Sequence, residues 1–220
     1  MIYNFFKWGV LLPGAFFRLK KCNVCSKNLH KGRLLIIQLH LNRIDMFKFE
    51  EILCCPEDKG DLEAIENKLL KCKICQHEYP VVNGIPRLLS GPYYNESWDE
   101  KWIKYDGGIG YNYRIIDETD MAYKIHNIIK FFEEKEQFLN SVKDSVVTLD
   151  VGCGVGQYAV RLLQLGAPFV IALDLSSGAV ETGKKIIKDK FPELSDRIMF
   201  VQADASFLPL KDDTFCVSQA

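Results

Sequence analysis

The stretch from Val146 to Gly156, VVTLDVGCGVG, constrains this chain more than any other. Its opening run, Val146 to Asp150, is short, apolar and β-branched, which indicates a buried strand. A segment with helical periodicity, Gln157 to Leu165, comes directly after the stretch. Between them, glycine recurs at alternate positions, namely Gly152, Gly154 and Gly156. A strand, a glycine loop and a helix in this order make the first half of a βαβ unit that binds nucleotide-like cofactors.

The loop separates two kinds of cofactor site. A dinucleotide loop of the form G-x-G-x-x-G would have its third glycine at position 157, where this chain has Gln157. The carboxylate of Asp150 would also repel an NAD pyrophosphate, whereas it can receive a cationic amine directly or through water. An acid, one residue and then Gly-x-Gly-x-Gly resembles motif I of class I S-adenosylmethionine (SAM) dependent methyltransferases. We therefore expect SAM as the cofactor.

Two later strands end in the residue types that a nucleoside site needs. Phe169 to Leu173 predicts a second strand, and Asp174 at its end can hydrogen-bond both ribose hydroxyls, in SAM and NAD sites alike. Ser176 or Ser177 then caps a predicted helix that runs to about Lys190. Ile198 to Gln202 predicts a third strand, followed by an acid where the family has its adenine contacts. The cofactor-binding residues implied by the resemblance are Asp150, Gly152, Cys153, Gly154, Gly156, Asp174, Leu175, Asp204 and Ala205.

A second motif begins upstream at Ile52, in ILCCPEDKGDLEAIENKLLKCKICQHEYPVVNGIPRLL. It resembles the small zinc ribbon of the Trm112 type, which has C-P-x-C, a hairpin, C-x-x-C, Tyr-Pro and a closing GIP-x-L. Asp58 stands where the second cysteine of that pattern is expected. Asn83-Gly84 predicts a tight turn after a strand that contains Val81 and Val82. The matching residues are Cys55, Pro56, Cys72, Cys75, Tyr79, Pro80, Gly84, Ile85 and Pro86.

The ribbon motif raises the question of a metal. A structural zinc site takes four ligands in a tetrahedron, usually Cys or His. The resemblance implies Cys55, Cys72 and Cys75 as three ligands, and Asp58 is the candidate for the fourth that stands at the family's ligand position. Cys54, His77 or an upstream thiol are the alternatives for the fourth position, and a ribbon that has lost its metal and relies on packing is the competing interpretation.

Composition bounds the setting of the protein. Eight cysteines without a secretory signal fit a reducing compartment, so we expect a cytoplasmic protein whose thiols bind metal or are buried. The net charge of −1 gives no general attraction to nucleic acid, although residues 1–50 carry nine Lys or Arg against two acids. Within residues 1–21, the apolar start at 1–17 is interrupted by Lys7 and Pro13 and is too short for a transmembrane span. Packing on the protein's own core is favoured there over a helix in a membrane interface.

These patterns predict an α/β protein. We expect a Rossmann-like SAM-binding domain with an incomplete doubly wound sheet, and a small N-terminal β-rich module that resembles a zinc ribbon. Within the methyltransferase part, Thr119 to Val142 has helical periodicity. The predicted division of the chain is a basic aromatic arm at 1–51, the ribbon at 52–89, an aromatic connector at 90–118 and a partial class I methyltransferase domain at 119–220.

The resemblance implies transfer of the SAM methyl group by in-line displacement, with catalysis resting on positioning. A small-molecule or glycan-type acceptor is favoured, and no catalytic base is identified. Ribosomal RNA is the alternative acceptor, because some rRNA guanine methyltransferases combine a ribbon with a basic arm, but the acidic remainder of the chain disfavours nucleic acid. A non-catalytic remnant that binds a partner protein through the ribbon is the rival from another functional class.

The last residues predict a fourth strand, Thr214 to Ser218, in which Cys216 replaces the acid that usually follows Phe215. The family's later strands are not matched before Ala220. We expect the fourth strand to present an unpaired edge beside Val146 to Asp150. The 220-residue chain would then bind SAM weakly at best, transfer no methyl group alone and be poorly soluble unless a partner protein completes the sheet.

Overall fold

The computed structural model describes residues 18–19, 48–91, 99–100, 136, 147–212 and 217–219. Most of the N-terminal arm and most of the aromatic connector lie outside these residues. So do the periodic segment Thr119 to Val142, apart from Glu136, and the lead-in to the fourth strand at 213–216.

Three parallel strands form the centre of the fold: β6 (Thr148–Val151), β7 (Val170–Asp174) and β8 (Ile198–Ala203). β7 pairs with β6 on one side and with β8 on the other, both in parallel. Its residues before Asp174 are all buried, as expected for a strand that is covered on both faces. The three strands predicted from the sequence are confirmed, with slightly shifted ends.

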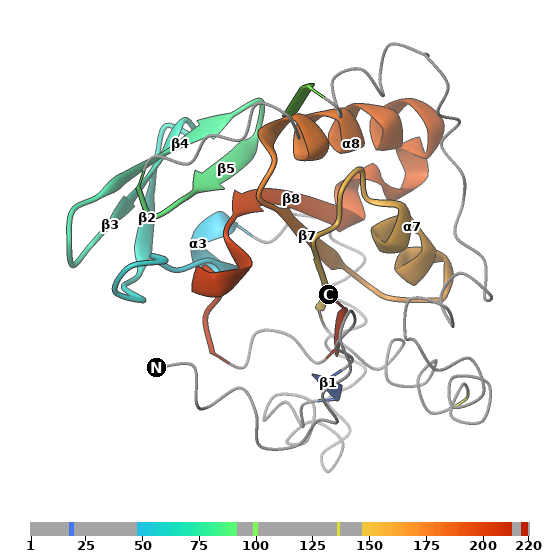
Figure 1. Ribbon diagram of the computed structural model, residues 1–220, viewed down its shortest axis with the longest axis horizontal. Coiled ribbons are helices and arrows are strands. Elements are labelled where there is room, and N and C mark those ends of the chain that lie inside the picture. Colours follow the sequence, from blue (N-terminus) through green and yellow to red (C-terminus); the bar gives the residue numbers. More distant parts are fainter. Residues whose placement is uncertain are drawn as a thin grey trace.

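Two helices cover one face of these strands (Figure 1). α7 (Gln157–Gln164) buries its apolar stripe there, including Val160 and Leu163. α8 (Ser177–Lys190) is capped by Ser176, whose Oγ accepts a hydrogen bond of 3.1 Å from the Ala179 N–H. A serine cap of this kind satisfies an N–H that the first helical turn leaves without a partner. A short 3-10 helix, η1 (Pro192–Arg197), then leads into β8.

The ribbon is an antiparallel meander that joins the central sheet. It consists of β2 (Leu62–Ile65), β3 (Leu69–Cys72), β4 (Glu78–Val82) and β5 (Ile85–Leu88). The Asn83-Gly84 turn has φ values of 53° and 68°, as a tight hairpin with two left-handed residues requires. β5 then pairs in parallel with β8, placing Arg87 opposite Gln202. With β1 (Arg18–Leu19) and β9 (Val217–Gln219) included, the strand order among the described residues is therefore β1-β9-β6-β7-β8-β5-β4-β3-β2.

The ribbon also shares a hydrophobic core with the second face of the central sheet. α3 (Phe49–Ile52) and the chain after it bring Ile52 and Leu53 against this face, and the backbone of Cys54 donates to the Pro209 carbonyl at 3.0 Å. Each fully buried apolar side chain of the size of Ile or Leu contributes about 1.5 to 3 kcal/mol to the free energy of unfolding. One continuous cluster includes Leu53, Cys55, Leu70, Tyr79, Leu88, Leu149, Ile171, Leu173, Met199 and Val201. The ribbon is therefore held by packing as well as by strand pairing.

The expectation of an unpaired fourth strand was wrong. β9 (Val217–Gln219) lies parallel to β6, as predicted, but its other side pairs antiparallel with β1 (Arg18–Leu19). The backbone groups of β9 are met by a segment from the far end of the chain, a pairing that no local pattern announces. Within the described part of the chain, no helix has the length and apolar character needed to cross a bilayer.

Candidate cofactor site and metal centre

The loops after β6, β7 and β8 lie at one edge of the sheet, because the three strands are parallel neighbours. The chain proceeds from β6 to β7 and β8 on one side, and β9 lies on the other side of β6. The strand order thus reverses at β6. Open α/β sheets bind their ligands at such a switch point, outside the carboxyl ends of the strands. The predicted cofactor residues all fall at this edge.

Two glycines of the loop after β6 serve different purposes. Gly152 has φ +69°, and a Cβ there would meet no atom of the described residues within 4 Å, so this part of the structure leaves open space beside the loop backbone. Gly156 has φ +78°, and a Cβ there would lie 2.9 Å from Phe200 Cζ. Gly152 therefore leaves room for a ligand to approach the backbone, whereas Gly156 lets the loop pack closely on β8.

Alanine at these two positions should separate the two roles. Gly156→Ala is expected to lower the free energy of unfolding by about 1 to 3 kcal/mol more than Gly152→Ala, because both residues suffer the left-handed backbone but only position 156 adds a clash. Urea unfolding of the two variants measures this difference. Equal losses would show that Gly156 has no special packing role.

Asp174, at the end of β7, ties two of the loops together. Its Oδ2 accepts from the Gly154 N–H at 2.8 Å and its Oδ1 accepts from the Ser176 N–H at 2.9 Å. The side chain is half-buried, and a carboxylate has about four lone-pair sites, so it retains capacity for further donors. The geometry is compatible with the predicted contact to ribose hydroxyls.

The remaining predicted residues divide into accessible and buried groups. Leu175 is half-buried, and its carbonyl accepts from Gln202 Nε2 at 2.9 Å. Asp204 is half-buried and caps the short helix η2 (Ala205–Phe207), in which Ala205 is exposed. The side chain of Asp150 is fully buried, and Cys153 is buried as well. These two lie beneath the loop surface, and contact between Asp150 and a ligand amine stays a prediction.

The structure adds Asp99, which the sequence reasoning did not single out. Its carboxylate accepts from Ser176 Oγ at 2.5 Å, from Ser177 Oγ at 3.1 Å and from the Gly178 N–H at 3.0 Å. A Cβ on Gly178 would lie 2.8 Å from the Asp99 carbonyl oxygen, so glycine permits this close approach. The acid lies 77 residues before Ser176, and no local motif marks it as a helix cap.

The predicted metal ligands come together in the ribbon. Cys55, Asp58, Cys72 and Cys75 each offer an atom within 4.8 Å of the others. Cys55 Sγ lies 3.7 Å from Cys75 Sγ, and Cys72 Sγ lies 3.3 Å from Asp58 Oδ1. A tetrahedral zinc ion with bonds of about 2.3 Å separates its sulfur ligands by roughly 3.8 Å. Three thiols and one carboxylate at these separations fit zinc.

Charge in this cluster is set by its hydrogen bonds. The Gly60 N–H donates to Asp58 Oδ1 at 2.7 Å, and this bond is the main reason that the pKa of Asp58 falls to about 2. A hydrogen bond from the His77 backbone lowers the pKa of Cys75, but desolvation and its neighbours Cys72, Asp58 and Cys55 raise that pKa to about 12. Without a metal, then, Asp58 is ionised and Cys75 is protonated at neutral pH.

The alternative fourth ligands are placed elsewhere. Cys54 is buried outside the cluster, and desolvation is the main reason that its thiol pKa is raised. His77 stacks on Tyr79 with ring centroids 4.5 Å apart, and its Nδ1 lies 3.6 Å from Glu57 Oε1. The upstream thiols Cys22 and Cys25 lie outside the described residues. Among the alternatives that the structure describes, Asp58 is the one in the cluster.

Fold and site together define an α/β domain with a glycine loop at the switch point of its sheet, joined to a ribbon with a cluster of side chains that could hold a metal ion. Residues 148–219 match the family described as Methyltransferase domain, and residues 47–84 match the family described as Trm112p-like protein. These two segments of the chain are thus similar to a methyltransferase domain and to a Trm112p-like protein, respectively.

Individual relatives match over part of the chain. Demethylmenaquinone methyltransferase of Clavibacter sepedonicus is 39% identical over 67 residues, which is 30% of this chain and 25% of the relative. Ubiquinone/menaquinone biosynthesis C-methyltransferase UbiE of Methylobacterium nodulans is 39% identical over 69 residues, 30% of this chain and 26% of the relative. The chain thus spans about a quarter of the length of the curated relatives it matches.

Solved structures also match part of the chain. Magnesium protoporphyrin IX methyltransferase (ChlM) from Synechocystis PCC 6803, with bound SAH, matches with 20% identity and a TM-score of 0.29. The match covers 51% of this chain and 48% of that one. A TM-score at this level does not establish a detailed structural correspondence.

Proposed function

We propose that this chain binds SAM at the edge formed by the loops after β6, β7 and β8 and belongs to an enzyme that methylates a small molecule. The observation that carries the proposal is the pair of Gly152 and Asp174. Gly152 has open space beside it, and the Asp174 carboxylate is fixed next to the same loop by the Gly154 N–H. This arrangement suits a nucleoside whose ribose meets an acid while its other end passes over glycine backbone.

The choice of SAM over NAD rests on Gln157, which replaces the third glycine of a dinucleotide loop, and on the family match over residues 148–219. SAM supplies an activated methyl group, and the residues of this chain would bind and orient it. A small-molecule acceptor is supported by the two relatives whose names refer to quinones.

We further propose that Cys55, Asp58, Cys72 and Cys75 hold zinc as a structural ion. The ion would cross-link the segment before β2 to the β3–β4 connection, because these residues supply its ligands. Its chemistry there is structural, since three thiols and a carboxylate close a four-coordinate shell. Two other functions are distinguished by the choice of acceptor: methylation of ribosomal RNA, and a non-catalytic role in which the ribbon binds a partner protein.

The acceptor class is tested by incubating the chain with SAM labelled in its methyl group and three acceptor pools. The pools are an organic extract of small molecules, a polysaccharide fraction and ribosomal RNA. We expect label in the small-molecule pool. Label in RNA would support the rRNA alternative, and SAM binding without transfer to any pool would favour the non-catalytic alternative.

A further inference from the structure

We propose that Arg87, a residue of the ribbon, positions the cofactor loop after β7 and acts through Gln202. The inference rests on the proposed function, because it assigns a task to the SAM site. Arg87 is a positioning residue in this account, since it lies on β5 and reaches the loop through another side chain.

Gln202 connects the two parts through both ends of its amide. It lies on β8 directly opposite Arg87 and is 7% exposed. Its Oε1 accepts from Arg87 Nη1 at 3.3 Å, and its Nε2 donates to the Leu175 carbonyl at 2.9 Å. An amide has one acceptor end and one donor end, so the contact with Arg87 fixes which end faces the loop. The orientation of Gln202 thus depends on the ribbon.

Arg87 is itself held in a defined position. It is 9% exposed, and its Nη2 pairs with the Glu181 carboxylate on α8. Desolvation lowers the pKa of Arg87, although Glu181 opposes that shift. A buried cation is tolerated when it is paired and hydrogen-bonded, so this guanidinium favours one arrangement of β5, α8 and β8.

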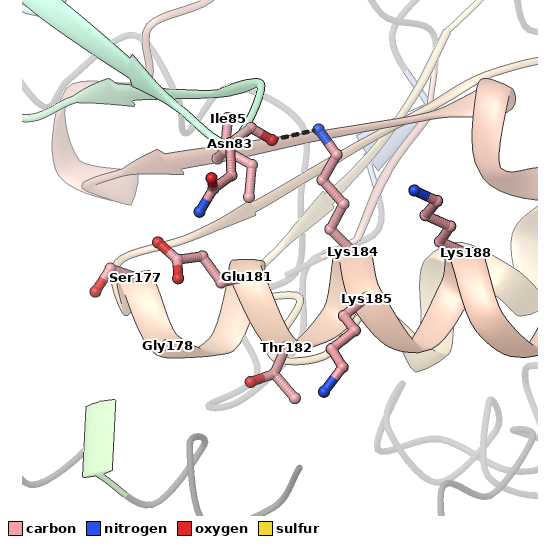
Figure 2. A pocket seen from close by; sticks show the side chains of 9 residues that line it. All are labelled: Asn83, Ile85, Ser177, Gly178, Glu181, Thr182, Lys184, Lys185 and Lys188. Carbon is pink, nitrogen blue, oxygen red and sulfur yellow. Dashed lines mark hydrogen bonds between the residues drawn. The ribbon is translucent and has the colours of Figure 1, made fainter.

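The seam between the ribbon and α8 contains a second polar link that serves as a natural control. A hollow of about 440 Å³ lies there, lined by the β4–β5 turn and by one side of α8. Figure 2 shows Glu181 and Lys184 pointing from α8 toward the turn. Lys184 Nζ donates to the carbonyls of Asn83 and Gly84, each at 2.9 Å. These bonds attach the turn to the helix, and none of them reaches Leu175.

Leu175 sits where a small displacement would affect the cofactor. Asp174 before it is bonded to the glycine loop, and Ser176 after it is bonded to Asp99. The Gln202 bond fixes the carbonyl between these two anchors. Loss of that bond would free the peptide next to the predicted ribose ligand, and binding energy would then be needed to order it.

The test compares three variants of the whole 220-residue chain. Arg87→Met removes the guanidinium. Gln202→Glu keeps the shape and the partner for Arg87 but cannot donate to the Leu175 carbonyl. Lys184→Met removes the separate link across the same seam and is the matched control.

Two readouts are combined: SAM affinity by calorimetry, and hydrogen exchange of residues 174–178 without ligand. We expect Arg87→Met and Gln202→Glu to weaken SAM binding about five- to tenfold and to speed exchange in that segment. Lys184→Met should leave both near wild type, even if it lowers Tm.

The inference would be overturned if Gln202→Glu exchanged residues 174–178 at the wild-type rate and bound SAM within about twofold of the wild-type affinity. An equal loss of affinity in Lys184→Met would assign the effect to general attachment of the ribbon and overturn it as well. Failure of the wild-type chain to bind SAM would refute the proposed function, while the exchange data would still decide whether Arg87 orders the loop. If Arg87→Met does not fold, the isosteric Gln202→Glu variant decides alone.

Discussion

Cys72→Ser is expected to abolish zinc binding, whereas Cys54→Ser should retain about one zinc ion per chain. Cys72 is a member of the four-residue cluster, and Cys54 is a buried thiol outside it. The two substitutions make the same chemical change in neighbouring parts of the ribbon, so their difference isolates ligation from the loss of a buried sulfur. Metal analysis of the purified proteins measures the stoichiometry.

Substitutions of Asp58 test the predicted zinc site through its one carboxylate ligand. Asp58→Cys supplies a fourth thiolate and should raise zinc affinity, whereas Asp58→Ala should lower it.

Zinc affinity should fall as the pH falls, because protons compete for the thiols, including Cys75 with its raised pKa. Asp58 has a pKa of about 2, so its carboxylate stays ionised while the thiols take up protons. A zinc-free wild type whose spectrum does not respond to a chelator would instead support a ribbon held by packing.

Asp174→Ala is expected to weaken SAM binding by about 1 to 3 kcal/mol, which is roughly five- to 150-fold in Kd. The substitution removes the predicted ribose acceptor and also the acceptor for the Gly154 and Ser176 N–H groups. Both sets of lost interactions lie at the loops after β6 and β7. Neither belongs to the hydrophobic core that the ribbon shares with the central sheet. Isothermal titration of the variant with SAM measures the change.

The control for Asp174 is Asp189→Ala, which removes an exposed carboxylate from α8. It makes the same change in charge without touching the glycine loop, and SAM affinity should stay at the wild-type value. An Asp174→Ala protein that binds SAM as tightly as wild type would contradict the assignment of this acid to the cofactor.

The parts of the fold that were predictable are those with local, periodic signals. The run before Asp150 reads as a buried strand because it is apolar and β-branched, and Ser176 or Ser177 reads as a cap because the pair precedes a periodic segment. The clustering of the predicted metal ligands was expected from the resemblance to a zinc ribbon, in which Cys72 and Cys75 form a knuckle with two residues between them. For the strand and the helix cap, the physical cause lies within a few residues.

The rest depends on contacts between distant segments. The pairing of β5 with β8 brings Arg87 opposite Gln202, and the hydrophobic pattern of either strand alone does not select that partner. The same holds for Asp99 at the start of α8 and for Arg18–Leu19 beside β9. An arginine in GIPRLL reads as a surface residue in isolation, and it becomes a buried ion-pair partner only because Glu181 and Gln202 meet it there.

The most direct test of the cofactor assignment is a calorimetric titration of the wild-type chain with SAM and, separately, with NADH. The open space beside Gly152, the carboxylate of Asp174 and the absence of glycine at position 157 predict that SAM binds more tightly. NADH binding more tightly than SAM would contradict the account.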